Sequence, residues 1–495
     1  MMRFHPGFGP DSWGGSVSGT FLWVGESVGM SRHERSLALR VILVAVVVAV
    51  GSGLPAIAQT AATSSPNASG ANGVIIDAQG VLRLQHFPDP GGRLVKQRIA
   101  QARANLNADV AQPSPLRKVS LNRLEAAVRK RLEAGQLPSD EMAFLAGMTR
   151  VRYVFYYPDT RDIVLAGPAE GWAADASGRV LGFETGRPVL QLQDLIVALR
   201  VFPPGQQKAR TILCSIDPTP EGLARLNQFW SSIGRNISPT DTQRIVNGMR
   251  TSLGMQDVRI GGISANTHFG QILLECDYRM KLIGIGMERP PVKMASYVDR
   301  AKPSSSKNAL QRWYFVPQDN CARVAADGLG LELVGDVVKL VSENEVVAGD
   351  GGRSASGRRN KASELFCRAF TRKYADIAAR LPVFAEMRNV IDLAIVAAFV
   401  NQQDFYAQAD WRAETFNDER TLPVETYKTP VHVESVCTAV IKGNRLYTPV
   451  GGGVTIRPRE ALRSENLLPD EDGVITATRQ SIDIKDLPAD QWWWD

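Results

Sequence analysis

The chain has 495 residues, of which 44% are hydrophobic and 22% charged, and its formal net charge is +6. These values are typical of a globular protein and exclude a fully disordered, collagen-like or coiled-coil chain. The length allows about two to three domains. Basic residues form no long run, which argues against a nucleic-acid-binding stripe. The densest basic cluster, at 353–361, lies in a Gly/Ser stretch typical of a solvated linker.

The N-terminal region resembles an export signal. Three arginines precede the apolar run Val41–Val50, and the sequence Ala56-Ile57-Ala58 follows it. A basic region, a short apolar stretch and an A-x-A end are typical of a secretory signal peptide, so we expect cleavage to leave Gln59 first. The alternative is an uncleaved helical anchor at 37–58. Residues 1–29 do not fit a signal, and we interpret them as a non-physiological extension before a start at Met30.

The order of the predicted elements indicates an α+β protein with two main lobes. After the signal segment at 30–58 we expect a flexible lead-in at 59–72 and an N-terminal α+β lobe at 73–300. A linker at 301–311 then leads to a C-terminal α+β lobe at 312–460, which includes a flexible loop at 348–361. The polar stretch 461–495 is predicted to be a loose tail.

In the first lobe, strands and helices alternate. Asp77–Gly80 predicts a hairpin turn, and helical spacing predicts helices near 94–111 and after Ser120. Strands are expected at 151–157 and 210–216, and helices at 190–201, after Glu221 and at 241–253. A strand is expected at 271–285, because apolar and charged residues alternate there with a period of two.

In the second lobe we expect a strand meander between about 313 and 341. Two helices follow, and the second contains the apolar run Leu393–Val400, which indicates a central, buried helix. Gly443-Asn444 predicts a two-residue hairpin turn between two strands.

The predicted strand at 271–285 supplies candidate ligand-binding residues. Its expected outer face carries Glu275, Asp277, Arg279 and Lys281. Neighbouring carboxylates and cations are expected to stay ionised. Two interpretations remain: a surface ion-pair ladder or a polar recognition face. We expect Ile272, Leu274, Tyr278 and Met280 to be buried on the other face.

Known catalytic and metal-binding motifs are absent from the sequence. His268 is the candidate base, and Cys214, Cys276 or Cys321 would be its nucleophile if the fold brought them together. No two of the five cysteines show C-x-x-C spacing, so the sequence predicts no metal site and no cofactor. Buried thiols and disulfides both remain open for an exported chain.

The chain ends in Trp492, Trp493, Trp494 and Asp495. Three adjacent indole rings expose a large apolar surface, so we expect at least one to dock. The docking surface would be the body of the protein, a partner, or a membrane interface, where tryptophan is favoured. The tryptophans are therefore the candidate interaction residues.

Several long stretches resemble a known family. They include YYPDTRDIVLAGPAEGW at 156–172, ECDYRMKLIGIGMERPPV at 275–292 and PVFAEMRNVIDLAIVAAF at 382–399. These blocks are similar to a family of exported planctomycete proteins known as domain of unknown function 1598. The resemblance extends from about Gly73 to Ile456. It implies an exported bacterial protein and brings no catalytic residues.

The sequence therefore favours an exported protein of the periplasm or extracellular space. It would act as a non-catalytic binding or structural component of the cell envelope. The alternative is an envelope hydrolase with an unrecognised active site. The expected partner is an envelope component or protein, with peripheral membrane contact as a further option and no nucleic acid.

Overall fold

The computed structural model describes residues 70–76, 81–208, 210–233, 239–301, 309–347, 353–355, 357, 359–440, 446–447 and 450–495. All of them belong to one compact unit, Thr63–Asp495. The extension at 1–29, the signal segment at 30–58 and the lead-in up to residue 69 lie outside the described residues, as does the turn at Gly443-Asn444.

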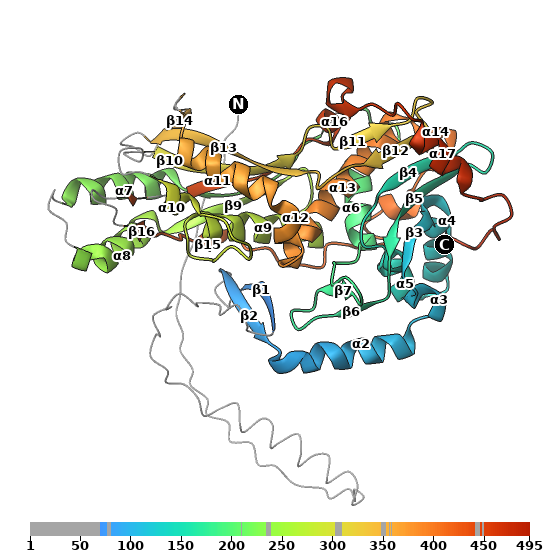
Figure 1. Cartoon of the computed structure of the whole chain (residues 1–495), viewed down its shortest axis with the longest axis horizontal. Coiled ribbons are helices and arrows are strands. Elements are labelled where there is room, and N and C mark those ends of the chain that lie inside the picture. The colour runs from blue at the N-terminus through green and yellow to red at the C-terminus, as the bar shows by residue number, and fades with distance from the viewer. Residues whose placement is uncertain are drawn as a thin grey trace, which may run out of the picture. The chain divides into compact units, whose positions relative to one another are not determined.

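Two seven-stranded mixed sheets and the helices around them confirm the α+β class (Figure 1). The first sheet is antiparallel except between its third and fourth strands. Its strands in spatial order are β14 (Arg353–Ala355), β13 (Val338–Val347), β10 (Ala309–Pro317), β18 (Val450–Ile456), β8 (Ile212–Pro218), β9 (Met255–Gly261) and β15 (His432–Glu434).

The second sheet is antiparallel except at its first pair of strands. Its order is β19 (Leu467–Leu468), β11 (Ala322–Val324), β12 (Gly330–Leu333), β4 (Tyr153–Tyr157), β5 (Asp162–Ala169), β3 (Ser114–Ser120) and β20 (Trp493–Trp494). Three strand pairs stand apart: β1 (Gly70–Ile76) with β2 (Leu82–Pro88), β6 (Trp172–Ala174) with β7 (Val180–Gly182), and β16 (Ala439–Val440) with β17 (Leu446–Tyr447).

The helices of the N-terminal half are α2 (Arg93–Asn105), α3 (Ala108–Ala111), α4 (Leu121–Glu133), α5 (Asp140–Ala143), α6 (Leu192–Val201), α7 (Pro220–Ser232), α8 (Thr242–Leu253), α9 (His268–Gly284) and α10 (Tyr297–Arg300). Those of the C-terminal half are α11 (Lys361–Arg372), α12 (Tyr374–Ala378), α13 (Pro382–Gln402), α14 (Phe405–Gln408), α15 (Glu414–Asn417), α16 (Pro458–Ala461) and α17 (Val474–Ser481).

Two helices form the centre of the core. Every residue of α13 from Val383 to Asn401 is buried, which confirms the central helix expected around Leu393–Val400. The helix α9 packs on β8, β18 and β10 and on the neighbouring helices α6 and α13. In the part of the chain that the structure describes, no helix is long and apolar enough to cross a membrane.

Both large sheets contain strands from both predicted lobes. In the first sheet β18 lies between β10 and β8, and in the second β12 lies beside β4. The stretch expected to link two lobes, 301–311, therefore joins parts that share both sheets.

The expectation of a loose C-terminal tail was wrong. The helix α17 and the strands β19 and β20 order this segment along the second sheet. Ile475, Ile482, Ile484 and Trp494 form a small core with Phe155 of β4 and its neighbours. These few apolar residues are separated by polar ones that face solvent, so the sequence alone shows no core-forming pattern.

Candidate functional site

The largest difference from the sequence analysis concerns residues 271–285. They form most of α9, not a strand, and both their apolar and their charged side chains are buried. The helix is enclosed by the first sheet, α6 and α13, so no face of it is left for solvent. The alternating pattern also contains two pairs of opposite charge with the i,i+4 spacing of a helix, Glu275–Arg279 and Asp277–Lys281. The predicted surface ladder is therefore a set of buried ion pairs.

The first pair belongs to a network of five charges, of which Glu275, Arg279 and Glu386 are buried and the other two half-buried. Arg179 donates to Glu386 at 2.9 Å and to Glu275 at 2.5 Å. Arg279 donates to Glu275 at 3.4 Å and to Glu288 at 2.6 Å. Burial opposes the charge on Arg179, but the two carboxylates outweigh burial and raise its pKa. The network ties α9 to α13 and to the segment after β6.

The second pair connects α9 to the first sheet. Lys281 donates to Asp277 at 2.8 Å and to the carbonyl of Ile216 at 2.6 Å. The same Asp277 oxygen accepts the backbone N–H of Ile216 at 3.0 Å, while the other has no partner among the described residues. Burial raises the pKa of Asp277 to about 6, although Lys281 lowers it. This geometry is that of a structural clamp.

His268 lies in the first turn of α9 and pairs with Asp194 of α6. Its Nδ1 is 2.8 Å from the Asp194 carboxylate, and its side chain is 16% exposed. Burial opposes the charged imidazole, but Asp194 outweighs burial and raises the pKa of His268. Its other nitrogen lies 3.5 Å from the side-chain nitrogen of Gln191. Among the described residues, neither ring nitrogen forms a hydrogen bond with a hydroxyl or a thiol, so no nucleophile is placed to give its proton to this base.

The hydroxyl groups and thiols nearest to His268 in the sequence are engaged or buried. The Thr267 hydroxyl caps α9 and donates to the carbonyl of Ser264 at 2.8 Å. Cys276 donates to the carbonyl of Val383, about 12 Å along the helix from His268 at the usual rise per residue. All five cysteines are buried and unpaired. Burial raises the pKa of each thiol, for example to about 12 at Cys437, so all five are held as unreactive thiols.

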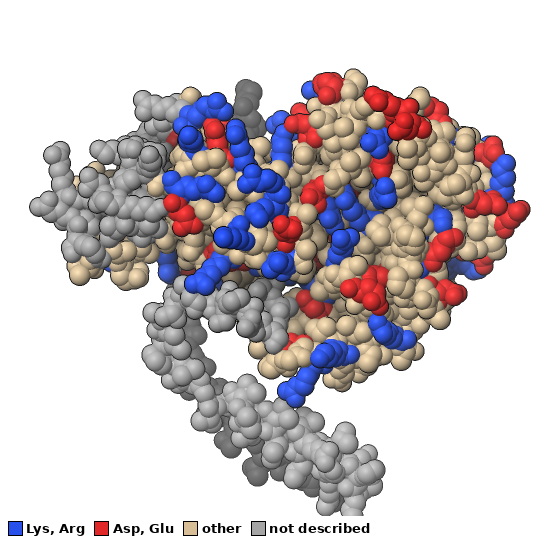
Figure 2. All heavy atoms as spheres, in the orientation of Figure 1, with Lys and Arg blue, Asp and Glu red and all other residues tan. Residues whose placement is uncertain are grey.

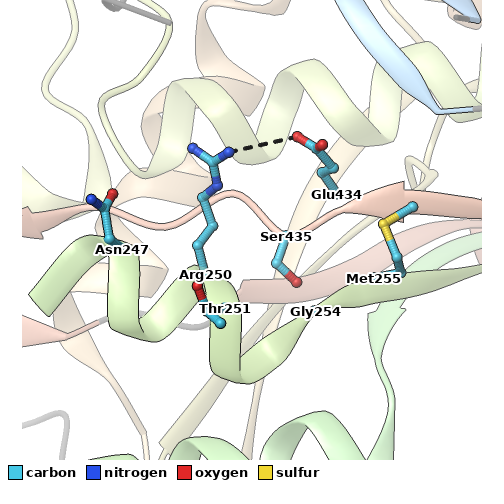
Figure 3. A pocket seen from close by; sticks show the side chains of 7 residues that line it. All are labelled: Asn247, Arg250, Thr251, Gly254, Met255, Glu434 and Ser435. Carbon is cyan, nitrogen blue, oxygen red and sulfur yellow. Dashed lines mark ion pairs between the residues drawn. The ribbon is translucent and has the colours of Figure 1, made fainter. Parts of the chain in front are cut away.

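A pocket of about 430 Å³ opens between the C-terminal end of α8 and β15 (Figure 3). Its lining residues are Asn247, Arg250, Thr251, Gly254, Met255, Glu434 and Ser435. Arg250 reaches Glu434 over 3.8 Å, a long ion pair that leaves the guanidinium loosely held. The hydroxyl of Ser435 is buried and has no hydrogen-bond partner among the described residues.

The local sequence explains why this pocket forms. Gly254 ends α8 with a φ of +66°, a conformation that glycine adopts without strain, and the chain turns directly into β9. The strand β15 pairs with β9 at the edge of the sheet, with Glu434 opposite Met255. Two segments about 180 residues apart in the chain therefore line the pocket, and no sequence motif predicts it.

The C-terminal tryptophans lie on the body of the protein. Trp493 and Trp494 pair with β3, and the backbone carbonyl of Trp492 accepts the N–H of Ser120 at 2.9 Å. The neighbouring Asp495 receives two hydrogen bonds from the fully buried Arg117, at 2.9 and 2.8 Å. The rings of Trp492 and Trp494 are therefore buried against this chain itself.

The geometry defines an α+β protein with a charged, buried central helix and a separate polar pocket at a sheet edge. Residues 214–297 match the model of a family described as "Protein of unknown function (DUF1598)". This match confirms, over that segment, the resemblance to a domain of unknown function. The segment contains all of α9 and the α8 residues that line the pocket. No curated protein and no solved structure matches the chain.

Proposed function

We propose that the protein is a non-catalytic binding component of the cell envelope. Its ligand is a small polyhydroxylated molecule, such as an envelope sugar, held in the pocket between α8 and β15. The observation that carries this proposal is the buried Ser435 hydroxyl, which lines the pocket without a partner. A buried polar group without a hydrogen bond costs free energy, and a ligand hydroxyl would supply the missing bond.

The other lining groups suit the same ligand chemistry. Arg250 donates, Glu434 accepts, and Asn247 does both, which matches sugar hydroxyls that also donate and accept. Met255 is 37% exposed and offers an apolar contact for the C–H face of a sugar ring. A few convergent polar groups beside an apolar contact are typical of a small-molecule site.

An envelope hydrolase is the second candidate function. The pairing of His268 with Asp194 favours it, because a carboxylate-oriented imidazole is a common general base. The occupied hydroxyl of Thr267 and the buried thiols weigh against it. Analysis of the sugar after prolonged incubation with the protein separates the two functions: an unchanged sugar supports binding alone, and a cleaved one supports the hydrolase.

Calorimetric titration with amino-sugar mono- and disaccharides of the cell wall tests the binding proposal. Ser435→Ala and Arg250→Met are each expected to weaken binding by roughly tenfold, because each removes one hydrogen-bonding group. Arg244→Met is the matched control, since Arg244 lies on the same helix but pairs with Asp241 outside the pocket. Equal affinities for all four proteins, or no binding of any sugar, would reject this pocket as the site.

Export belongs to the same proposal. The basic and apolar segment at 30–58 supports it, and cleavage after Ala58 gives a mature chain that begins at Gln59. Mass spectrometry of the protein recovered from the envelope fraction is expected to find Gln59, with or without cyclisation, at the N-terminus. A chain that still carries residues 37–58 would instead show an uncleaved anchor.

A further inference from the structure

Exposed cations gather over the part of the surface where α11 and α12 lie (Figures 1 and 2). We define this basic face by eight residues from α10, α11 and the turns beside α10 and α12: Arg289, Lys293, Arg300, Lys361, Arg368, Arg372, Lys373 and Arg380. Seven of these side chains are exposed and Lys373 is half-buried. The sequence analysis missed the face because its cations come from separate segments that only the fold brings together.

Packing contacts make the face continuous. The short helix α10 packs against α11, and α11 against α12. Arg380, just after α12, donates to the carbonyl of Pro291 and so connects to the turn that carries Arg289 and Lys293. A side chain at Gly286 would touch Val298 of α10, which places the start of that turn beside α10.

The positive charges on this face are only partly balanced by neighbouring acids. None of the eight cations forms an ion pair with any residue that the structure describes. Four carboxylates lie in the same segments. Glu288 is paired with Arg279, Asp299 is held in the capping box of α10, and Glu364 is paired with Arg359. The fourth, Asp376, is exposed on α12 and offsets one of the eight positive charges. The face therefore keeps a net positive charge and attracts an anionic partner.

Two apolar side chains lie among these cations. On α11 the exposed positions Lys361, Leu365, Arg368 and Arg372 follow one another at helical spacing, so Leu365 stands within the basic stripe. Leu365 is 37% exposed, and Met287, two residues before Arg289, is 41% exposed. Basic residues around exposed apolar side chains are the pattern of a surface that lies on an anionic membrane.

We propose that this basic face docks the protein on a membrane rich in anionic phospholipid, with Leu365 and Met287 entering the headgroup region. A single-stranded nucleic acid would instead call for exposed aromatic rings on which bases stack, and none is among the exposed residues of the face. The basic face shares no residue with the pocket between α8 and β15, so this inference stands apart from the proposed function.

Sedimentation with vesicles of equal parts phosphatidylglycerol and phosphatidylcholine tests the proposal. The chain from Gln59 is used, because the residues after Ala62 form one compact unit. Salt-sensitive binding is expected, and Arg368→Glu/Arg372→Glu is expected to weaken it by about tenfold or more. Arg129→Glu/Lys130→Glu on α4 is the control with the same change in charge and is expected to leave vesicle binding unchanged.

Leu365→Gln distinguishes a membrane from a soluble polyanion. It is expected to weaken vesicle binding severalfold and to leave binding of polyphosphate unchanged. Circular dichroism checks that each variant is folded. Three results would overturn the proposal: no binding to anionic vesicles, an equal loss in the α4 control, or vesicle binding that Leu365→Gln leaves intact.

Discussion

Replacing Arg179 by methionine is expected to lower the free energy of unfolding by about 3–5 kcal/mol. Arg179 is the only cation that the structure pairs with Glu386 within the described residues, and it also holds Glu275. Removing it leaves a buried carboxylate without a counter-charge, which costs more than the lost hydrogen bonds alone. Urea unfolding monitored by circular dichroism measures the change.

Arg187→Met is the matched control for this experiment. Arg187 lies on the surface in the same segment of the chain and makes no ion pair with a described residue. Its replacement is expected to change the free energy of unfolding by less than about 0.5 kcal/mol. If Arg179→Met proves as mild as the control, the network around Glu275 does not hold α9 in place.

Lys281→Met is expected to destabilise the protein by a similar amount, about 3–5 kcal/mol, at pH 8. It leaves Asp277 buried without its counter-charge, with only the backbone N–H of Ile216 as a partner of the same oxygen. The double variant Asp277→Asn/Lys281→Met removes both charges and is expected to recover a large part of the loss. A double variant that is less stable than Lys281→Met would contradict the clamp assigned to this pair.

The pH dependence of stability gives this pair a second readout. The folded-state pKa of Asp277, about 6, lies above its ordinary value of 3.8. Between these two pH values, the folded protein holds a proton that the unfolded chain has released. The stabilising contribution of this group is therefore fully present below about pH 3.8 and is lost as the pH rises through about 6. The contribution that is lost amounts to roughly 3 kcal/mol. Replacing Asp277 should remove this part of the pH dependence and leave the part that comes from other shifted groups, such as Asp392. For the same reason, Lys281→Met should cost less at pH 5 than at pH 8.

The sequence predicted those elements whose side-chain pattern has one interpretation. The helix α11 has a clear apolar stripe that includes Phe366 and Phe370, and α13 has an apolar run too long for solvent. The prediction of a strand at 271–285 was wrong because alternating apolar and charged residues fit both a half-exposed strand and a fully buried helix. The spacing of Glu275 to Arg279 and of Asp277 to Lys281 was the signal that would have favoured the helix.

The candidate site was harder to predict than the fold, because its parts meet only in space. Arg179 neutralises Glu275 of α9 from a position far away in the chain, and Arg179 is itself paired with the equally distant Glu386. The pocket combines Arg250 with Ser435, and both belong to segments without a motif. The charged residues of α9, which the sequence suggested for ligand recognition, are buried in ion pairs that connect the helix to its neighbours.

We infer that the charges of α9 support the fold and propose that ligands bind at the pocket between α8 and β15. The most direct test is the sugar affinity of two folded variants, Asp277→Asn/Lys281→Met and Ser435→Ala, measured side by side by calorimetry. The first variant is expected to bind like the unchanged protein, and the second about tenfold more weakly. Loss of binding in the first variant with full affinity in the second would place recognition at α9 and contradict the claim.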